Sequence, residues 1–133
     1  MTGYKHIEHC CGVYIASNYK SPVEIGIGNN TDAAIVIHEA GYLIRATDIR
    51  ACTPPSWLSF IRDDIFAPNL DFYTGTDVLY SVRPAEEMVP PMNDLARTLN
   101  CDLVVYHLGF EGYGDGGEVV QCGVPLHIYH RKR

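Results

Sequence analysis

The stretch VEIGIGNN, residues 23–30, constrains the fold of this chain more than any other part of the sequence. Its apolar half predicts a short buried strand at residues 23–27, and the residues after it predict a helix at 31–40. Gly26 and Gly28 therefore stand between a strand and a helix. Glycine lets the backbone turn sharply and approach a ligand closely, and the start of a helix offers free N–H groups. The segment is consistent with a ligand-binding loop and also with a plain tight turn.

Strands and helices alternate along the rest of the chain. The spacing of apolar residues predicts helices at residues 4–18, 31–40 and 86–99. Pro90 and Pro91 must lie in the first turn of the last helix or delay its start. Short apolar runs predict strands at residues 23–27, 42–48, 57–64, 77–82 and 102–108, and a C-terminal hairpin at 118–123 and 125–130. This alternation indicates a single α/β domain over residues 1–133 with a mainly parallel sheet.

Polar residues gather where the first four predicted strands end. These ends read EIGIGNN, TDIR, RDDI and YSVRP, whereas the bodies of the strands are apolar. In open parallel sheets, ligands bind at the carboxyl ends of the strands, beside the point where the strand order reverses. Asp48 ends the strand after Gly28, where a carboxylate can accept hydrogen bonds from both hydroxyls of a ribose. The simpler alternative is that Asp48 caps a turn.

The residue at the last position of the glycine motif distinguishes between two possible cofactors. A dinucleotide fingerprint has the form G-x-G-x-x-G/A, and Thr31 stands where its last small residue belongs. Glu24, two residues before Gly26, instead favours S-adenosylmethionine. Through Glu24, Gly26, Gly28 and Asp48 the chain resembles the class I S-adenosylmethionine-dependent methyltransferases, over residues from about 4 to 130.

The resemblance implies a fold and a cofactor site. It implies a Rossmann-like sheet of order 3-2-1-4-5 followed by a C-terminal antiparallel hairpin, here with a reduced set of helices. Asp48 corresponds to the ribose ligand, Asp63 or Asp64 to the residue that contacts adenine, and YSVRP to the fourth motif. The cofactor site that it implies consists of Glu24, Gly26, Gly28, Asn29, Asp48, Ile49, Asp63, Asp64, Ser81 and Arg83.

A second resemblance covers the same segments. VEIGIGNN, ATDIR, FIRDDIFAPNL and LYSVRP look like the uncharacterised protein family 0146 of archaea, a small methyltransferase-like group. This resemblance supports the fold more than it supports a particular reaction.

Arg83 has two interpretations. Its guanidinium can hold a carboxylate or phosphate bidentately, either the methionine carboxylate of the cofactor or an anionic substrate. Alternatively, Arg83 forms an ion pair with Glu86, Glu87 or Asp63.

The sequence leaves the catalytic residues and the activity open. The amino-methylating motif, Asp or Asn followed by two prolines and an aromatic residue, is absent. Methyl transfer depends more on alignment than on acid–base groups, so this absence does not exclude an enzyme. Residues near the strand ends that could contribute are Tyr80, Ser81, Tyr106 and His107. Two functions remain: a small methyltransferase, or a non-catalytic module or partner subunit that binds S-adenosylmethionine or a nucleotide.

Charge and composition limit the partners and the compartment. A net charge of -6 gives no overall attraction to nucleic acid or anionic membranes, although the basic residues 131–133 could touch a phosphate backbone. No apolar run reaches the roughly 18 residues of a membrane span, and the first residues lack a signal-peptide core. We therefore expect a cytoplasmic protein whose five cysteines are thiols. His6, His9 and Cys10 have helical spacing that suits a metal, but an exposed helix face explains them as well, and we assign no metal.

The small number of helices predicts an uncovered face. The helices at 4–18 and 31–40 should share one face of the sheet by right-handed crossover, which leaves the helix at 86–99 for the other. The irregular stretch 66–73, rich in aromatic residues, should cover part of that face. We therefore expect self-association or a protein partner on the face that carries residues 66–73 and 86–99.

Overall fold

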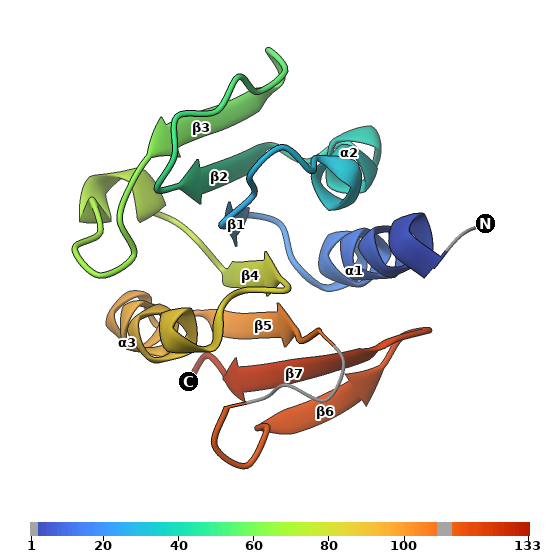
Figure 1. The fold of residues 1–133 in the computed structure, drawn as a ribbon, viewed down its shortest axis with the longest axis vertical. Helices are drawn as coiled ribbons and strands as arrows, with labels where there is room; N and C mark the ends of the chain where they lie inside the picture. The colour runs from blue at the N-terminus through green and yellow to red at the C-terminus, as the bar shows by residue number, and fades with distance from the viewer. Residues whose placement is uncertain (1–2, 109–112) are drawn as a thin grey trace.

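The computed structural model describes residues 3–108 and 113–133 (Figure 1). Residues 109–112, part of a glycine-rich loop predicted after the fifth strand, lie outside the described residues. The α-helices are α1 (Gly3–Asn18), α2 (Asp32–Glu39) and α3 (Val89–Leu99), and the short 3-10 helices are η1 (Leu70–Tyr73) and η2 (Glu86–Met88). The strands are β1 (Pro22–Ile25), β2 (Ile44–Asp48), β3 (Leu58–Arg62), β4 (Val78–Val82), β5 (Asp102–Tyr106), β6 (Glu118–Gln121) and β7 (Pro125–His130).

The seven strands of the described residues belong to one sheet, in the order β3-β2-β1-β4-β5-β7-β6. The first five are parallel, whereas β7 runs antiparallel to both β5 and β6 (Figure 1). This confirms the predicted order and the C-terminal hairpin. The order reverses at β1, so the carboxyl ends of β1 and β4 flank the switch point at which such sheets bind ligands.

Strand β1 ends two residues earlier than predicted. Gly26 has φ 75, so the chain leaves the strand there instead of continuing to residue 27. The N–H groups of Gly26 and Ile27 both donate to the carbonyl oxygen of Thr47, at 2.9 and 3.2 Å. The turn after β1 is therefore fastened to the end of β2.

The prolines set the start of α3. Residues 86–88 form η2, and α3 begins at Val89, so that Pro90 and Pro91 fall in its first turn. Proline is tolerated there because the first N–H groups of a helix have no partner within the helix. The predicted helix at 86–99 is thus a 3-10 turn followed by an α-helix.

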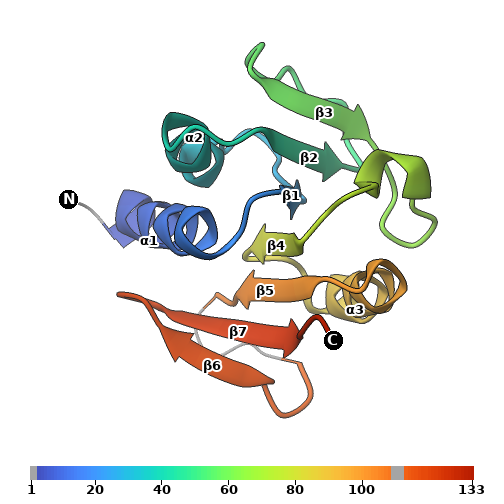
Figure 2. The same cartoon turned by 180° about the vertical axis from the view of Figure 1, so that it is seen from behind.

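The two faces of the sheet are covered by different elements. Helices α1 and α2 lie together on one face, as predicted, and α3 lies on the other (Figures 1 and 2). Side chains alternate along β1, so Val23 and Ile25 pack with α3 while Glu24 points to the side of α1. No helix in the described residues is long and apolar enough to span a membrane.

An arginine holds the irregular connection between β3 and β4. Arg45 of β2 donates through Nη1 to the carbonyl oxygens of Phe72 and Thr74, at 2.6 and 3.0 Å. Through Nη2 it donates to the hydroxyls of Ser21 and Thr76, at 2.9 and 3.0 Å. Three of these four bonds fix residues 72–76 against the sheet, where a crossover helix would otherwise provide the packing, and the fourth adds Ser21 to the same anchor.

The stretch 66–73 is covered unevenly. Tyr73 is fully buried, whereas Phe66 and Leu70 are 63% and 50% exposed. Apolar surface therefore remains beside α3. Association through this face stays a prediction, and light scattering over a concentration series would test it: a strict monomer at high concentration would contradict it.

Asp102, at the start of β5, joins two distant segments. Its carboxylate accepts the Tyr19 hydroxyl at 2.6 Å, the Lys132 backbone N–H at 2.6 Å and Arg131 Nη1 at 3.2 Å. Arg131 also pairs with Glu118, with Nη2 2.8 Å from Oε2. The basic residues at 131–133 are therefore partly engaged in the fold rather than forming a solvated tail.

Candidate functional site

A cavity of about 330 Å³ opens at the carboxyl ends of β1, β2, β3 and β4. This is the location that the sheet topology favours for a ligand. Its walls are formed by Ile25, Gly26, Thr47, Asp48, Ile49, Arg50, Asp63, Asp64, Ile65, Phe66, Ser81, Arg83, Pro84, Ala85, Glu87 and Met88.

Most of the predicted site residues line the cavity. Those that line it are Gly26, Asp48, Ile49, Asp63, Asp64, Ser81 and Arg83. Glu24, Gly28 and Asn29 are not among its lining residues. Gly28 still contacts the site indirectly, because its N–H donates to Asp48 Oδ2 at 2.7 Å.

Asp48 caps a turn and also lines the cavity. Its Oδ1 accepts the Arg50 N–H at 2.9 Å, which closes the capped turn of the simpler interpretation. Arg50 Nε lies 3.4 Å from the same oxygen, and Oδ2 accepts the Gly28 N–H. A carboxylate offers about four lone-pair sites, so these three bonds leave Asp48 with acceptor capacity beside the cavity.

The two loop glycines adopt backbone conformations that favour glycine. Gly26 has φ 75 and Gly28 has φ 55. A Cβ added to Gly26 would lie 3.5 Å from Met88 Cε and 3.9 Å from Ser81 Oγ, two cavity-lining side chains. A Cβ added to Gly28 would lie 2.9 Å from Arg50 Nη2. A side chain at Gly26 would thus extend toward two residues of the cavity wall.

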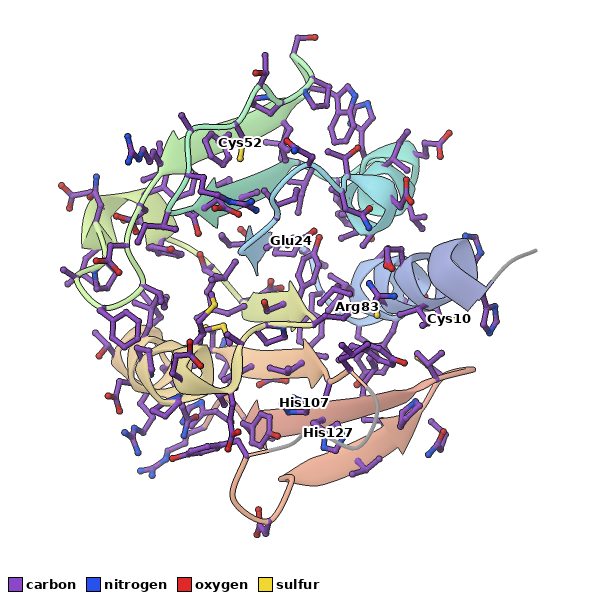
Figure 3. The ribbon with its side chains drawn as sticks, viewed as in Figure 1. Cys10, Glu24, Cys52, Arg83, His107 and His127 are labelled. Atoms are coloured by element: carbon purple, nitrogen blue, oxygen red, sulfur yellow. The ribbon has the colours of Figure 1, made fainter. Side chains whose placement is uncertain are left out.

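Glu24 lies on the other side of the sheet from the cavity-lining Ile25. It is 4% exposed, and its Oε1 accepts the Tyr80 hydroxyl at 2.8 Å (Figure 3). Burial raises its pKa to about 8; the Tyr80 hydrogen bond lowers the pKa, and the nearby Glu8 raises it further. Glu24 is therefore a buried, protonated group at neutral pH.

The ion pair of Arg83 differs from the predicted ones. Its Nη1 lies 2.8 Å from Oε1 and 3.1 Å from Oε2 of Glu8, on α1, rather than pairing with Glu86, Glu87 or Asp63. Its guanidinium also lies over the Tyr106 ring, 5.6 Å from the centroid. Glu8 is buried, and the Arg83 side chain is 17% exposed. Figure 3 shows Arg83 reaching from the end of β4 toward α1.

The acidic pair after β3 shapes the loop beside the cavity. Asp63 accepts the Asn69 N–H at 3.2 Å on both oxygens and lies 3.4 Å from the Tyr73 hydroxyl. Asp64 Oδ1 accepts the Phe66 N–H at 3.0 Å. These bonds position Phe66, which lines the cavity together with Ile49 and presents an apolar wall suited to a flat ring.

Several cavity residues were missed from sequence. Arg50, Phe66, Glu87 and Met88 line the cavity and were not among the predicted site residues. The position of Arg50, two residues after Asp48, was a usable signal. The contributions of Glu87 and Met88 depend on how η2 folds back over β1, which no local pattern indicates.

Of the four residues that could contribute to catalysis, three lie outside the cavity wall. Tyr80 is buried against Glu24, and Tyr106 and His107 do not line the cavity. His107 Nε2 is hydrogen-bonded to the Tyr129 hydroxyl instead. Ser81 does line the cavity, and its hydroxyl donates to the carbonyl oxygen of Ile25 at 2.7 Å.

In the segment of α1 whose histidines and cysteine have a spacing that suits a metal, His6 contacts Cys10. Cys10 Sγ lies 3.7 Å from His6 Nε2, and His9 is exposed. In the part of the chain that the structure describes, no group of three or more potential ligands could hold a metal ion.

The fold and the position of the cavity define a class I methyltransferase-like, Rossmann-type domain. The methyltransferase CcbJ of Streptomyces caelestis matches 74% of this chain with a TM-score of 0.54 and 10% identity. An S-adenosylmethionine-dependent methyltransferase of Agrobacterium tumefaciens matches 84% of the chain with a TM-score of 0.54 and 14% identity. The chain spans about half of these proteins, 50% and 47% of their lengths.

A third solved structure contains a ligand. The 1,6-didemethyltoxoflavin-N1-methyltransferase of Burkholderia thailandensis, with bound 1,6-didemethyltoxoflavin and S-adenosylhomocysteine, matches 96% of this chain with a TM-score of 0.52 and 12% identity. The chain covers 63% of that protein. At these identities the likeness shows the fold.

The chain belongs to the Uncharacterised protein family UPF0146, whose family model matches residues 9–121. A UPF0146 protein of Archaeoglobus fulgidus is 35% identical over 103 residues, which cover 77% of this chain and 76% of the relative. A UPF0146 protein of Pyrococcus horikoshii is 33% identical over 110 residues, 79% of this chain and 84% of the relative.

Proposed function

We propose that the cavity binds S-adenosylmethionine or S-adenosylhomocysteine and that the protein transfers the methyl group to a substrate. One observation carries this proposal: residues from the ends of four neighbouring strands, predicted separately as cofactor ligands, line a single cavity at the switch point. The solved methyltransferases of similar fold support the same cofactor.

The cavity residues divide into three groups along the proposed ligand. Ile49 and Phe66 would enclose the adenine ring, with Asp63 and Asp64 near its edge. The remaining acceptor capacity of Asp48 would take the ribose hydroxyls. Gly26, Ser81 and Arg83 would surround the methionine portion, where the absence of a Cβ at Gly26 lets the backbone approach the ligand.

The proposed chemistry requires alignment of the reacting atoms. The cofactor supplies an activated methyl group, which a nucleophile of the substrate attacks while the sulfur leaves as a thioether. The residues around the cavity would orient the cofactor and exclude water from its buried end, and alignment of this kind can supply much of the rate enhancement. We assign no catalytic residue.

A second candidate is a non-catalytic S-adenosylmethionine-binding module or partner subunit. The cavity volume of about 330 Å³ favours it, because this is at the small end of ligand sites and suits one ligand. A methyl acceptor would have to approach from the open side, on a macromolecule or on a second subunit.

Calorimetric titration with S-adenosylmethionine, S-adenosylhomocysteine and NAD tests the binding proposal. We expect both adenosyl ligands to bind more tightly than NAD, with amide shifts at residues 24–32, 48–50 and 63–65. Shifts confined to other regions would reject the site. Incubation with tritium-labelled S-adenosylmethionine and an archaeal extract then separates the two candidates: an enzyme transfers label to an acceptor, whereas a binding module does not.

A further inference from the structure

Cysteines from opposite ends of the chain meet between α1 and the hairpin. Cys10 and Cys11 lie on α1, and Cys122 lies in the turn between β6 and β7. All five cysteines are free thiols. Figure 3 shows Cys10 on α1, on the side of the molecule toward which the hairpin extends.

Two contacts place the turn between β6 and β7 directly beside Cys10. Cys122 Sγ lies 3.8 Å from the carbonyl oxygen of Cys10. A Cβ placed on Gly123, the next residue, would lie 2.8 Å from Cys10 Sγ and 3.9 Å from Cys10 Cβ. The backbone of the turn therefore passes directly beside the Cys10 side chain, and the Cys122 sulfur contacts the Cys10 backbone, so the two cysteines lie next to each other.

The two thiols differ in access, and one has a base beside it. Cys122 is half-buried, whereas Cys10 is 9% exposed, so Cys122 is the more accessible residue of the two. Burial is the main cause that raises the pKa of the Cys10 thiol, and the nearby Cys122 raises this pKa further. Cys10 is therefore protonated at neutral pH. The His6 imidazole nitrogens lie 3.7 and 3.8 Å from Cys10 Sγ and can accept its proton.

We propose that Cys10 and Cys122 form a modification site, at which thiol–disulfide exchange with a low-molecular-weight disulfide closes an intramolecular disulfide. The Cys122 thiolate attacks the small disulfide, which forms a mixed disulfide and releases one thiolate of the reagent. The Cys10 thiol, losing its proton to His6, then attacks the Cys122 sulfur and expels the second thiolate. Two protein thiols are oxidised, and one small disulfide is reduced to two thiols.

The other cysteines are less suited to this chemistry. Cys101 is fully buried, and burial raises its pKa to about 12. Cys52 lies after β2, where its thiol is 3.6 Å from the carbonyl oxygen of Arg50. Cys11 is the real competitor, since it adjoins Cys10, but it is 3% exposed and burial raises its pKa most. The turn contacts Cys10 directly.

Closure of this disulfide would tie α1 to the hairpin and restrict the unfolded chain. The loop between Cys10 and Cys122 is long, so cross-linking removes much of the entropy of the unfolded state. We expect the oxidised protein to melt roughly 5–15 °C above the reduced protein. The inference does not depend on what the cavity binds.

Treatment of the full-length protein with oxidised glutathione, followed by mass spectrometry without reduction, tests the proposal. We expect a product lighter by two hydrogen atoms and a raised melting temperature, both reversed by dithiothreitol. Cleavage after glutamate separates Cys122 from Cys101, because Glu118 lies between them. The expected cross-linked pair joins the peptide that begins after Glu8 to the peptide that begins after Glu118.

Matched variants assign the bond. Cys11→Ala and Cys101→Ala should keep the mass loss and the melting shift, whereas Cys10→Ser and Cys122→Ser should lose both. Circular dichroism of the reduced variants shows whether each one folds. The peptide map of the parent assigns the bond to the peptide that contains both Cys10 and Cys11, and the variants distinguish these two cysteines. A lasting glutathione adduct on Cys122, a bond from Cys11, or an unchanged mass would each overturn the proposal.

Discussion

Asp48 and Glu24 are both acidic residues of the expected cofactor motifs, on neighbouring strands, yet they lie in opposite environments. Asp48 ends β2, lines the cavity and accepts the N–H groups of Gly28 and Arg50. Glu24 lies inside β1, away from the cavity, against the Tyr80 hydroxyl. The difference comes from position in the strand: the end of a strand reaches the ligand edge, whereas an interior residue faces one side of the sheet.

Arg83 connects these two regions. It lines the cavity, and its guanidinium pairs with Glu8 on the side of α1, where Glu24 is also buried. The charge of Glu8 is one of the causes that raise the pKa of Glu24. The cavity wall and the buried residues beneath α1 therefore lie on different sides of the sheet, and Arg83 contacts both. Four substitutions test how separate they are.

Glu8→Ala should have the largest effect, on stability. It removes the buried carboxylate that pairs with Arg83 Nη1, and breaking a buried ion pair typically lowers the free energy of unfolding by about 3–5 kcal/mol. Urea denaturation of the variant and the parent measures this. The control is Glu118→Ala, which removes an exposed partner of Arg131 and should leave the stability nearly unchanged. Equal stability of Glu8→Ala and the parent would show that the pair is not part of a tightly packed network.

Glu24→Gln should change the pH dependence of stability. The folded state keeps the Glu24 proton up to about pH 8, whereas the unfolded state loses it near the ordinary pKa of 4.5. The stabilising contribution of the protonated carboxyl is therefore complete below pH 4.5 and is lost as the pH rises to about 8.

Glutamine can still accept the Tyr80 hydrogen bond but does not titrate. At about pH 8 the Glu24→Gln protein should be more stable than the parent by roughly 2–4 kcal/mol, and this advantage should shrink toward about pH 5. Chemical denaturation at both pH values measures it. A constant difference at both would contradict burial of a neutral Glu24.

Gly26→Val should remove ligand binding while the sheet stays folded. The valine side chain would project toward Met88 and Ser81 in the cavity wall, and we expect the affinity for S-adenosylhomocysteine to fall by at least about 100-fold, equivalent to about 2.7 kcal/mol. Gly41→Val is the matched control, because Gly41 has φ 95 and nothing within 4 Å of its added Cβ. Both variants carry similar backbone strain of about 1–2 kcal/mol. Equal binding by Gly26→Val and the parent would support a plain tight turn.

Asp48→Ala should have the smallest effect of the four. Loss of the carboxylate should weaken S-adenosylhomocysteine binding by about 1–3 kcal/mol if it holds the ribose. Calorimetry would compare it with Asp94→Ala, a change at an exposed residue of α3. If both variants bind as the parent does, Asp48 serves the turn with Arg50 and not the ligand.

The features that were predictable from sequence are those set by local pattern. Alternating strands and helices, with right-handed crossovers, placed α1 and α2 on one face and α3 on the other. The polar residues that follow each strand, such as Gly26, Asp48 and Asp63, were expected at one edge because parallel strands end together. The two-residue alternation of β1 also placed Glu24 opposite Val23 and Ile25, although the resemblance to the methyltransferase motif suggested a cofactor contact.

The unpredicted features depend on long-range packing. Glu8 and Arg83 are 75 positions apart and meet because α1 crosses the end of β4. Arg83 also has φ 56, an uncommon value for a residue other than glycine, which redirects its side chain. The contribution of Met88 to the cavity likewise follows from how η2 packs, and no sequence periodicity reports it.

Asp102 has a consequence for the order in which the molecule opens. Because its carboxylate accepts both the Tyr19 hydroxyl and the Lys132 N–H, an opening that displaces Asp102 releases the segment after α1 and the residues after β7 together. The amide of Tyr19, bonded to Ile15 at 2.9 Å, and the amide of Lys132 should therefore exchange with solvent deuterium at matched rates. The segment after α1 and the residues after β7 would then unfold as one cooperative unit that the Asp102 side chain holds together.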